Sequence, residues 1–105
     1  MGKIIQVFTT LPTEEEAEKL ALGILKEKLG SCVQKLGPLR SFYWWKGKIE
    51  KEKEWLLIIK TTEEKFSLLE KFIKKNHPYE IPEIISVPVL QGNPDYLKWL
   101  EEELS

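Results

Sequence analysis

Residues 31–61 read SCVQKLGPLRSFYWWKGKIEKEKEWLLIIKT, and this stretch decides the fold. Its β-branched and aromatic residues predict two strands, Ser31 to Trp45 and Ile49 to Thr61, joined by a turn at Lys46-Gly47-Lys48. About 15 extended residues at about 3.3 Å each would reach about 50 Å, whereas a globule of about 100 residues is only about 34 Å across. The hairpin must therefore bend, for which Gly37-Pro38 is suited, or project from the body of the protein.

The far part of this predicted hairpin is rich in large aromatic side chains. They are Phe42, Tyr43, Trp44, Trp45 and Trp55. This is too much apolar surface for a free two-stranded ribbon, which is only marginally stable in water. Pairing with another copy of the chain would cover it, so we expect self-association.

A strand and a helix are predicted before the hairpin. The apolar run from Ile4 to Phe8 indicates a strand that ends ahead of Pro12. Thr13 and Glu16 have the spacing of a capping box, and apolar residues then recur at helical spacing. We expect this helix to end at Gly30, since glycine is the usual residue just past a helix C-terminus.

A second helix and strand are predicted after the hairpin. Thr61 and Glu64 have the spacing of another capping box, and the helix must stop before His77-Pro78 because a residue before proline disfavours the α region. A strand follows from Ile84 to Leu90, where Pro88 cannot donate to a ladder and therefore indicates an edge strand.

A short C-terminal helix completes the chain, because Asn93-Pro94 is typical of a helix start. The predicted order is β-α-β-β-α-β plus this helix, in a single domain over residues 1–105. That order is typical of the split βαβ (ferredoxin-like) α+β fold, with an antiparallel sheet and both crossover helices on one face.

Composition narrows the possible partners and the compartment. The 105 residues carry 16 basic and 17 acidic groups, a net charge of -1, so no global field draws the chain to nucleic acid or to anionic lipid. No apolar run approaches the roughly 20 residues of a membrane span, and the N-terminus turns polar too early for a signal peptide. The single cysteine, Cys32, permits no intrachain disulfide, so we expect a cytoplasmic protein.

Charge is carried almost entirely by Lys and Glu, while Asn, Gln, Cys and Met are scarce. This bias is associated with proteins that work at high temperature, so we expect a thermostable protein.

Several segments together resemble the CutA divalent-cation-tolerance family. They are Cys32-Val33, Ser41-Phe42-Tyr43-Trp44-Trp45-Lys46-Gly47-Lys48, Glu54 with Ile58-Ile59-Lys60-Thr61, His77-Pro78-Tyr79-Glu80-Ile81-Pro82-Glu83-Ile84, and Tyr96-Leu97-Lys98-Trp99. The resemblance implies a ferredoxin-like protomer, a homotrimer in which strands of neighbouring protomers extend each other's sheets, and a role in tolerance of metals such as copper.

Cys32 and His77 are the candidate metal ligands, because copper and zinc favour imidazole and Cu(I) favours thiolate. Two ligands do not complete a site within one protomer, so carboxylates such as Glu80 or repetition around a three-fold axis would have to complete it. The alternatives are a buried small hydrophobe for Cys32 and a helix cap for His77.

A ligand-binding cleft is the second candidate site. In a trimer whose hairpins cross onto their neighbours, further side chains can converge with Cys32 and His77 between subunits. These side chains are Tyr43, Trp45, Glu54, Lys60, Tyr79, Glu80 and Glu83. The alternatives are interface core for the aromatic residues and an ion-paired strand end for Lys60.

Three classes of function remain. The first is a homotrimeric metal-tolerance protein that binds copper, another divalent cation or a small ligand, with a PII-like small-ligand sensor as its closest alternative. The second is an RNA-binding domain, which shares the element order, although the aromatic-glycine signature is absent. The third is a hydrolase of acylphosphatase shape, whose phosphate chemistry requires an arginine in a loop. The only arginine, Arg40, instead lies within a predicted strand. A nucleophile needs a base within hydrogen-bond reach, and Cys32 with His77 is the only candidate pair. Because the sequence offers no further catalytic set, we expect binding without turnover.

Overall fold

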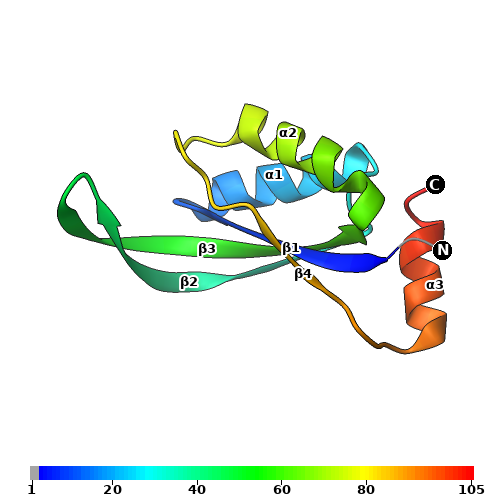
Figure 1. Cartoon of the computed structure of the whole chain (residues 1–105). Coiled ribbons are helices and arrows are strands. Elements are labelled where there is room, and N and C mark those ends of the chain that lie inside the picture. The colour runs from blue at the N-terminus through cyan, green and yellow to red at the C-terminus, as the bar shows by residue number, and fades with distance from the viewer. Residues whose placement is uncertain (1–2) are drawn as a thin grey trace.

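The computed structural model describes residues 3–105 and has the predicted element order (Figure 1). The elements are β1 (Ile4–Leu11), α1 (Glu14–Lys26), β2 (Cys32–Trp45), β3 (Lys48–Thr62), the 3-10 turn η1 (Glu63–Lys65), α2 (Phe66–Asn76), β4 (Ile85–Pro88) and α3 (Pro94–Glu102). None of the helices within residues 3–105 has the length and apolar character needed to cross a bilayer.

The four strands form one antiparallel sheet in the order β2-β3-β1-β4. The helices α1 and α2 cover one face of this sheet, and α3 lies at one end of it (Figure 1). This arrangement confirms the predicted ferredoxin-like α+β fold. The strand β4 is an edge strand, as predicted, although it is shorter than the expected Ile84 to Leu90. Pro88 lies opposite Ile5.

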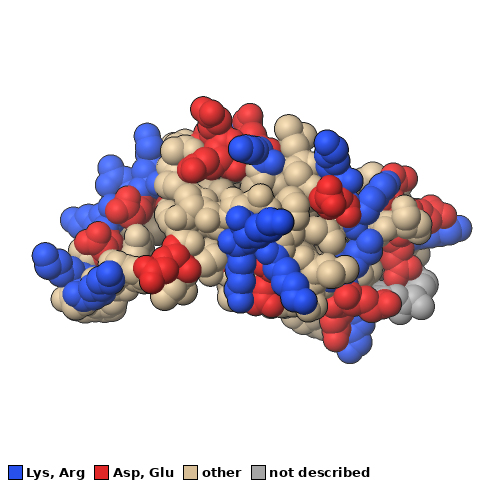
Figure 2. Space-filling model, turned by 90° about the horizontal axis from the view of Figure 1, so that it is seen from above, with Lys and Arg blue, Asp and Glu red and all other residues tan. Residues whose placement is uncertain are grey.

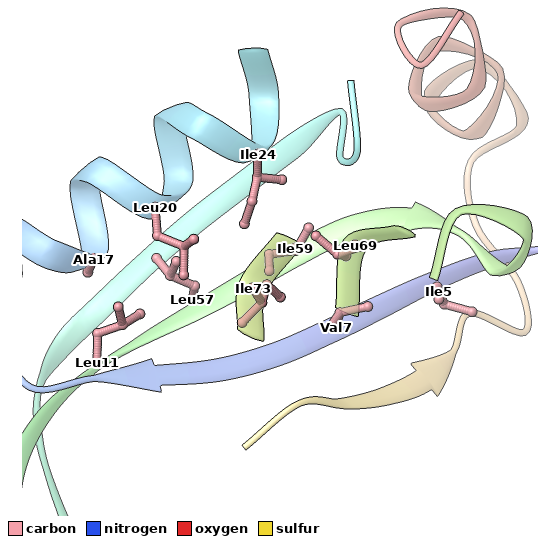
Figure 3. Packing of buried hydrophobic residues seen from close by; sticks show 10 residues of the cluster. All are labelled: Ile5, Val7, Leu11, Ala17, Leu20, Ile24, Leu57, Ile59, Leu69 and Ile73. Carbon is pink, nitrogen blue, oxygen red and sulfur yellow. The ribbon is translucent and has the colours of Figure 1, made fainter. Parts of the chain in front are cut away.

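The hydrophobic core lies between the sheet and the two covering helices (Figure 3). Its buried residues are Ile5, Val7, Leu11, Ala17, Leu20, Ile24, Leu57, Ile59, Leu69 and Ile73. The residues that β1 and β3 contribute to this cluster are all odd-numbered. Because side chains alternate across a strand, even-numbered residues of these strands lie on the opposite face, which we call the open face.

The β2–β3 hairpin both bends and projects, as its length predicted. The register shifts between Leu36 and Leu39, where Gly37 passes so close to the ring of Trp55 that a Cβ atom there would lie 2.6 Å from Cδ1. The hairpin extends well beyond the covering helices (Figure 1), so the molecule measures 45 × 25 × 23 Å.

The C-terminal end of α1 differs from the prediction. The helix ends at Lys26, and Lys28 adopts the left-handed conformation with φ of 58°. The N–H groups of Lys28 and Leu29 then bond to carbonyls of the last turn, which is a Schellman arrangement. Gly30 therefore does not terminate the helix. It lies against β3, where a Cβ atom would lie 2.8 Å from Cγ2 of Ile59.

The predicted capping box at Thr61 and Glu64 is wrong. Thr61 lies inside β3, opposite Ile5 of β1, and its buried hydroxyl has no hydrogen-bond partner among the described residues. The chain passes through η1 before α2 begins at Phe66. Strand pairing with β1 thus extends the strand across the expected helix start. The end of α2 at Asn76, before His77-Pro78, is as predicted.

Candidate functional site

A cavity of about 740 Å³ lies between the far part of the hairpin and the segment that follows α2. Its lining residues are Thr10, Ser41, Phe42, Tyr43, Trp45, Glu50, Glu54, Pro78, Tyr79, Glu80, Ile81 and Glu83. We call it the acidic cavity, because four of these residues are glutamates and none is Lys, Arg or His. Glu50 and Glu54 are even-numbered residues of β3, so the cavity belongs to the open face of the sheet.

Glu54 is the most buried charged group of the acidic cavity. Its side chain is only 4% exposed, and Tyr79 Oη donates a hydrogen bond of 2.7 Å to Oε2. Within residues 3–105 no Lys, Arg or His forms a salt bridge with it. The carboxylate therefore has one good donor and no compensating cation.

Neighbouring ionisable groups respond to this negative charge. Burial, followed by the hydrogen bond and the charge of Glu54, raises the pKa of Tyr79 well above its usual range. Burial and then the charge of Glu54 raise the pKa of Glu83. Partial desolvation, followed by the charges of nearby glutamates, raises the pKa of Tyr43. Desolvation is the largest cause of all three shifts, and the charges of nearby glutamates raise the three pKa values further.

His77 positions the segment that closes the cavity. Its Nδ1 accepts a hydrogen bond of 3.1 Å from the backbone N–H of Tyr79, and its Nε2 lies 2.8 Å from the carbonyl oxygen of Thr10. Because Nδ1 accepts, the proton is on Nε2, which donates to Thr10. Burial lowers the pKa of His77, against the opposing effect of the Thr10 carbonyl. The neutral imidazole thus ties the end of β1 to the loop that carries Tyr79.

We expect the protein to lose stability in acid through His77. A histidine whose folded pKa is depressed stabilises the fold above its unfolded pKa of about 6.5, and this contribution disappears as the pH falls through the folded value. Protonation of Nδ1 also breaks the bond from Tyr79, which contributes about 1 kcal/mol. Denaturation curves at pH 7.5 and 5.0 measure the effect. The loss between these pH values should be smaller in His77→Gln, and an equal loss in both proteins would contradict this role.

Lys60, a predicted ligand residue, does not reach the acidic cavity of its own protomer. It lies six positions after Glu54 on β3, about 20 Å away at about 3.3 Å per residue. Its Nζ donates to Tyr96 Oη of α3 at 3.1 Å and lies 5.4 Å from the centre of that ring. The other six predicted ligand residues, Tyr43, Trp45, Glu54, Tyr79, Glu80 and Glu83, all line the cavity.

The candidate metal ligands Cys32 and His77 lie apart within one protomer. Cys32 is opposite Lys60, which is opposite Gln6, whereas His77 is bonded to Thr10, four positions or about 13 Å further along β1. Both ring nitrogens of His77 are already engaged. Across residues 3–105 no three His, Cys, Asp or Glu side chains are grouped to hold a metal ion. One metal ion therefore cannot contact both residues of the same protomer.

Sequence reasoning missed half of the lining. The missed residues are Thr10, Ser41, Phe42, Glu50, Pro78 and Ile81. A signal for Glu50 was present, because it lies four positions before Glu54 on a strand and hence on the same face. It also lies directly opposite Tyr43 in the hairpin. For Thr10, which comes from β1, the sequence offers no comparable local signal.

Comparisons with known proteins find one family model and several relatives that match most of this chain. A family model described as CutA1 divalent ion tolerance protein matches residues 5–103. The divalent-cation tolerance protein CutA of Pyrococcus horikoshii is 49% identical over 100 residues, which cover 95% of this chain and 97% of that protein. A CutA homolog of Xenopus laevis is 42% identical over 99 residues, covering 94% of this chain. The chain spans 66% of the length of the Xenopus protein and 55% of a chloroplastic relative from Oryza sativa.

Solved structures agree with the sequence comparisons. The crystal structure of CutA1 from Oryza sativa has a TM-score of 0.95 at 41% identity and covers 97% of this chain and 94% of that one. A structure from Archaeoglobus fulgidus, described as a periplasmic divalent cation tolerance protein CutA, has a TM-score of 0.94 at 37% identity and covers 97% and 99% of the two chains. The resemblance deduced from sequence motifs is thereby confirmed.

Proposed function

Because the chain belongs to the CutA1 divalent ion tolerance family, we propose that it acts in tolerance of divalent metal ions as a homotrimer, binding a metal ion such as copper or a small ligand at clefts between subunits. The observation that carries this proposal is the acidic cavity, a ligand-sized hollow lined by four glutamates and by no basic side chain. The family is named for tolerance and not for an enzyme activity, and Cys32 lies too far from His77 to serve as a nucleophile beside a base. We therefore propose binding without turnover.

The hairpin supports self-association. Three large apolar side chains on its far part are mostly exposed, namely Phe42 at 64%, Trp44 at 72% and Ile49 at 59%. Trp44 lies directly opposite Ile49, so the two form one patch. The strands β2 and β4 are both edges of the sheet, and such edges offer backbone groups for pairing with another copy.

Charge supports clefts that two copies share. Lys60 and Cys32 lie at one end of the open face, and the acidic cavity lies at the other. A neighbouring copy that places its Lys60 end against this cavity brings a cation to the carboxylates. Such a contact is head-to-tail, and head-to-tail contacts close into rings when the rotation permits. A metal ion bound by Cys32 and His77 would likewise need the two residues from different copies.

A PII-like small-ligand sensor is the second candidate function. The volume of the cavity lies in the range of organic ligand sites, roughly 300–1,000 Å³. The described residues offer no grouping of three metal-ligating side chains. Both observations favour an organic ligand over a bare metal ion.

We also propose a cytoplasmic location, which rests on composition. Cys32 is the only cysteine and is a free thiol, so the fold needs no oxidising compartment. The periplasmic description belongs to the Archaeoglobus fulgidus protein.

Light scattering and calorimetry test the proposed function. We expect the mass of three chains at micromolar concentration, and saturable binding of either copper or a small ligand. Copper titrations of wild type, Cys32→Ser and His77→Ala test the proposed metal ligands, because loss of a ligand that contacts the metal should weaken binding at least about tenfold. Identical copper affinity in all three proteins would remove both residues from the site. A stable monomer would refute the proposed assembly.

A further inference from the structure

Within residues 3–105 of one protomer no cation balances the buried charge of Glu54, so either Lys60 of a neighbouring copy or a bound ligand can supply one. Burying an ionised carboxylate is costly unless it is paired, and a single tyrosine hydroxyl satisfies only one of its oxygens. Glu54 is nevertheless 96% buried, while its side chain lines the cavity. A cation that enters the cavity would remove this cost, so the arrangement favours a positively charged occupant.

The lining of the cavity differs in charge from the face of the molecule that Figure 2 shows. On the face of the molecule seen in Figure 2, acidic and basic side chains are interspersed. The cavity instead collects Glu50, Glu54, Glu80 and Glu83 without a basic residue, in a chain that has 16 basic residues. Burial raises the pKa values of Tyr79, Tyr43 and Glu83, and the charges of nearby carboxylates raise them further.

The glutamates of the cavity do not converge on one point. Within residues 3–105, no group of three His, Cys, Asp or Glu side chains is placed to hold a metal ion. A bare divalent ion would therefore lack the inner-sphere oxygen ligands that it requires. An occupant that carries positive charge at more than one position matches dispersed carboxylates better.

The walls of the cavity are aromatic. Phe42, Tyr43, Trp45 and Tyr79 line it together with the carboxylates. Aromatic faces attract ammonium groups through their quadrupole and also accept an aliphatic chain. The combination of carboxylates and aromatic walls suits an alkyl chain with charged ends.

We propose that the acidic cavity binds an organic polycation, whose simplest form is a linear diamine with one ammonium group on Glu54 and the other on the more exposed glutamates. This inference rests on the proposed ligand-binding function and specifies its ligand. The alkyl chain lies against Tyr43 and Trp45, and the free oxygen of Glu54 accepts from the first ammonium group. Tyr79 holds the other oxygen, which orients the carboxylate toward the ligand.

Calorimetry of the intact protein in low salt at pH 7.5 tests this inference. The probes are 1,5-diaminopentane, pentylamine with one charge, 1,5-pentanediol with none, and the chlorides of magnesium and copper. We expect the diamine to bind at least about tenfold more tightly than pentylamine, and the diol not to bind. Glu54→Gln should weaken the diamine about 30-fold or more, because it removes the buried half of a charge pair.

Two further variants make the result specific. Glu83→Gln should also weaken the diamine, and it changes a residue with an exposed surface at the cavity. Glu15→Gln removes the same charge from the surface of α1, away from the cavity, and should leave the affinity unchanged. Circular dichroism of each variant confirms that it is folded.

The possible outcomes separate this inference from the proposed function. Diamine affinity that is equal in wild type and in both cavity variants overturns the inference, as does a diamine that binds no better than pentylamine. Binding of copper or magnesium that depends on Glu54, without diamine binding, overturns the inference and leaves the proposed function standing. A protein that is monomeric and binds none of the probes overturns both.

Discussion

Leu20→Ala is expected to lower the free energy of unfolding by about 2–5 kcal/mol, whereas Leu22→Ala, two positions away on the same helix, should change it by less than about 0.5 kcal/mol. Leu20 is 4% exposed and belongs to the core between α1 and the sheet, whereas Leu22 is 68% exposed on the outer side of α1. Both variants delete the same atoms from the same helix. The difference between them therefore measures burial and the cavity that the deletion leaves.

Urea denaturation at one fixed protein concentration checks this result, because the stability of an oligomer depends on concentration. The comparison also tests the outer surface of α1. If Leu22→Ala costs as much as Leu20→Ala, a partner covers Leu22 in solution. If neither variant loses stability, the result contradicts the burial of Leu20 between α1 and the sheet.

Trp44→Glu is expected to dissociate the proposed trimer. Trp44 and Ile49 form an exposed apolar patch on the hairpin, and tryptophan is among the residues that contribute most to interface energies. A carboxylate at this position would be buried without a partner in every subunit contact, which costs several kcal/mol. The hairpin itself should survive, because residue 44 faces solvent within one protomer.

Light scattering and thermal melting measure the effect of Trp44→Glu. The Lys- and Glu-rich composition, together with the assembly, should place the wild-type melting transition above the mesophile range of about 45–65 °C, and the variant should melt lower. Lys46→Glu, in the turn of the same hairpin, introduces the same carboxylate and should leave the trimer intact. A wild-type transition inside that range contradicts the expected thermostability. A trimeric Trp44→Glu protein would exclude this patch as the subunit contact.

Sequence reasoning succeeded where the signal is local. Thr13 caps α1 because its hydroxyl accepts from the N–H of Glu16, three positions away. Pro78 ends α2 because its ring disfavours the helical conformation of the residue before it, His77. The edge position of β4 follows from the missing N–H of Pro88. In each case the deciding atoms are within a few residues of one another.

It failed where a distant strand decides the local structure. The spacing of Thr61 and Glu64 fits a capping box, but pairing of Thr61 with Ile5 keeps it in β3. Gly30 has the position of a helix terminator, yet its contact with Ile59 explains it, and Lys28 takes the left-handed conformation instead. Neither contact can be deduced from the residues beside it.

The candidate site, too, was predictable from the sequence only in part. The family resemblance supplied Glu54 and Tyr79 as candidates. The rise of about 3.3 Å per residue along a strand shows that Lys60, six positions from Glu54, cannot share a cavity with it in one protomer. The sequence by itself determined the order of the elements, the capped starts of α1 and α3, the edge strand and the overlong hairpin, because these depend on neighbouring residues. Only the tertiary structure decided that the loop after α2 folds over Glu54, bonds it through Tyr79 and leaves its charge facing a cavity without a cation. Burial of that carboxylate depends on segments 25 positions apart, whose approach is set by the packing of the whole sheet.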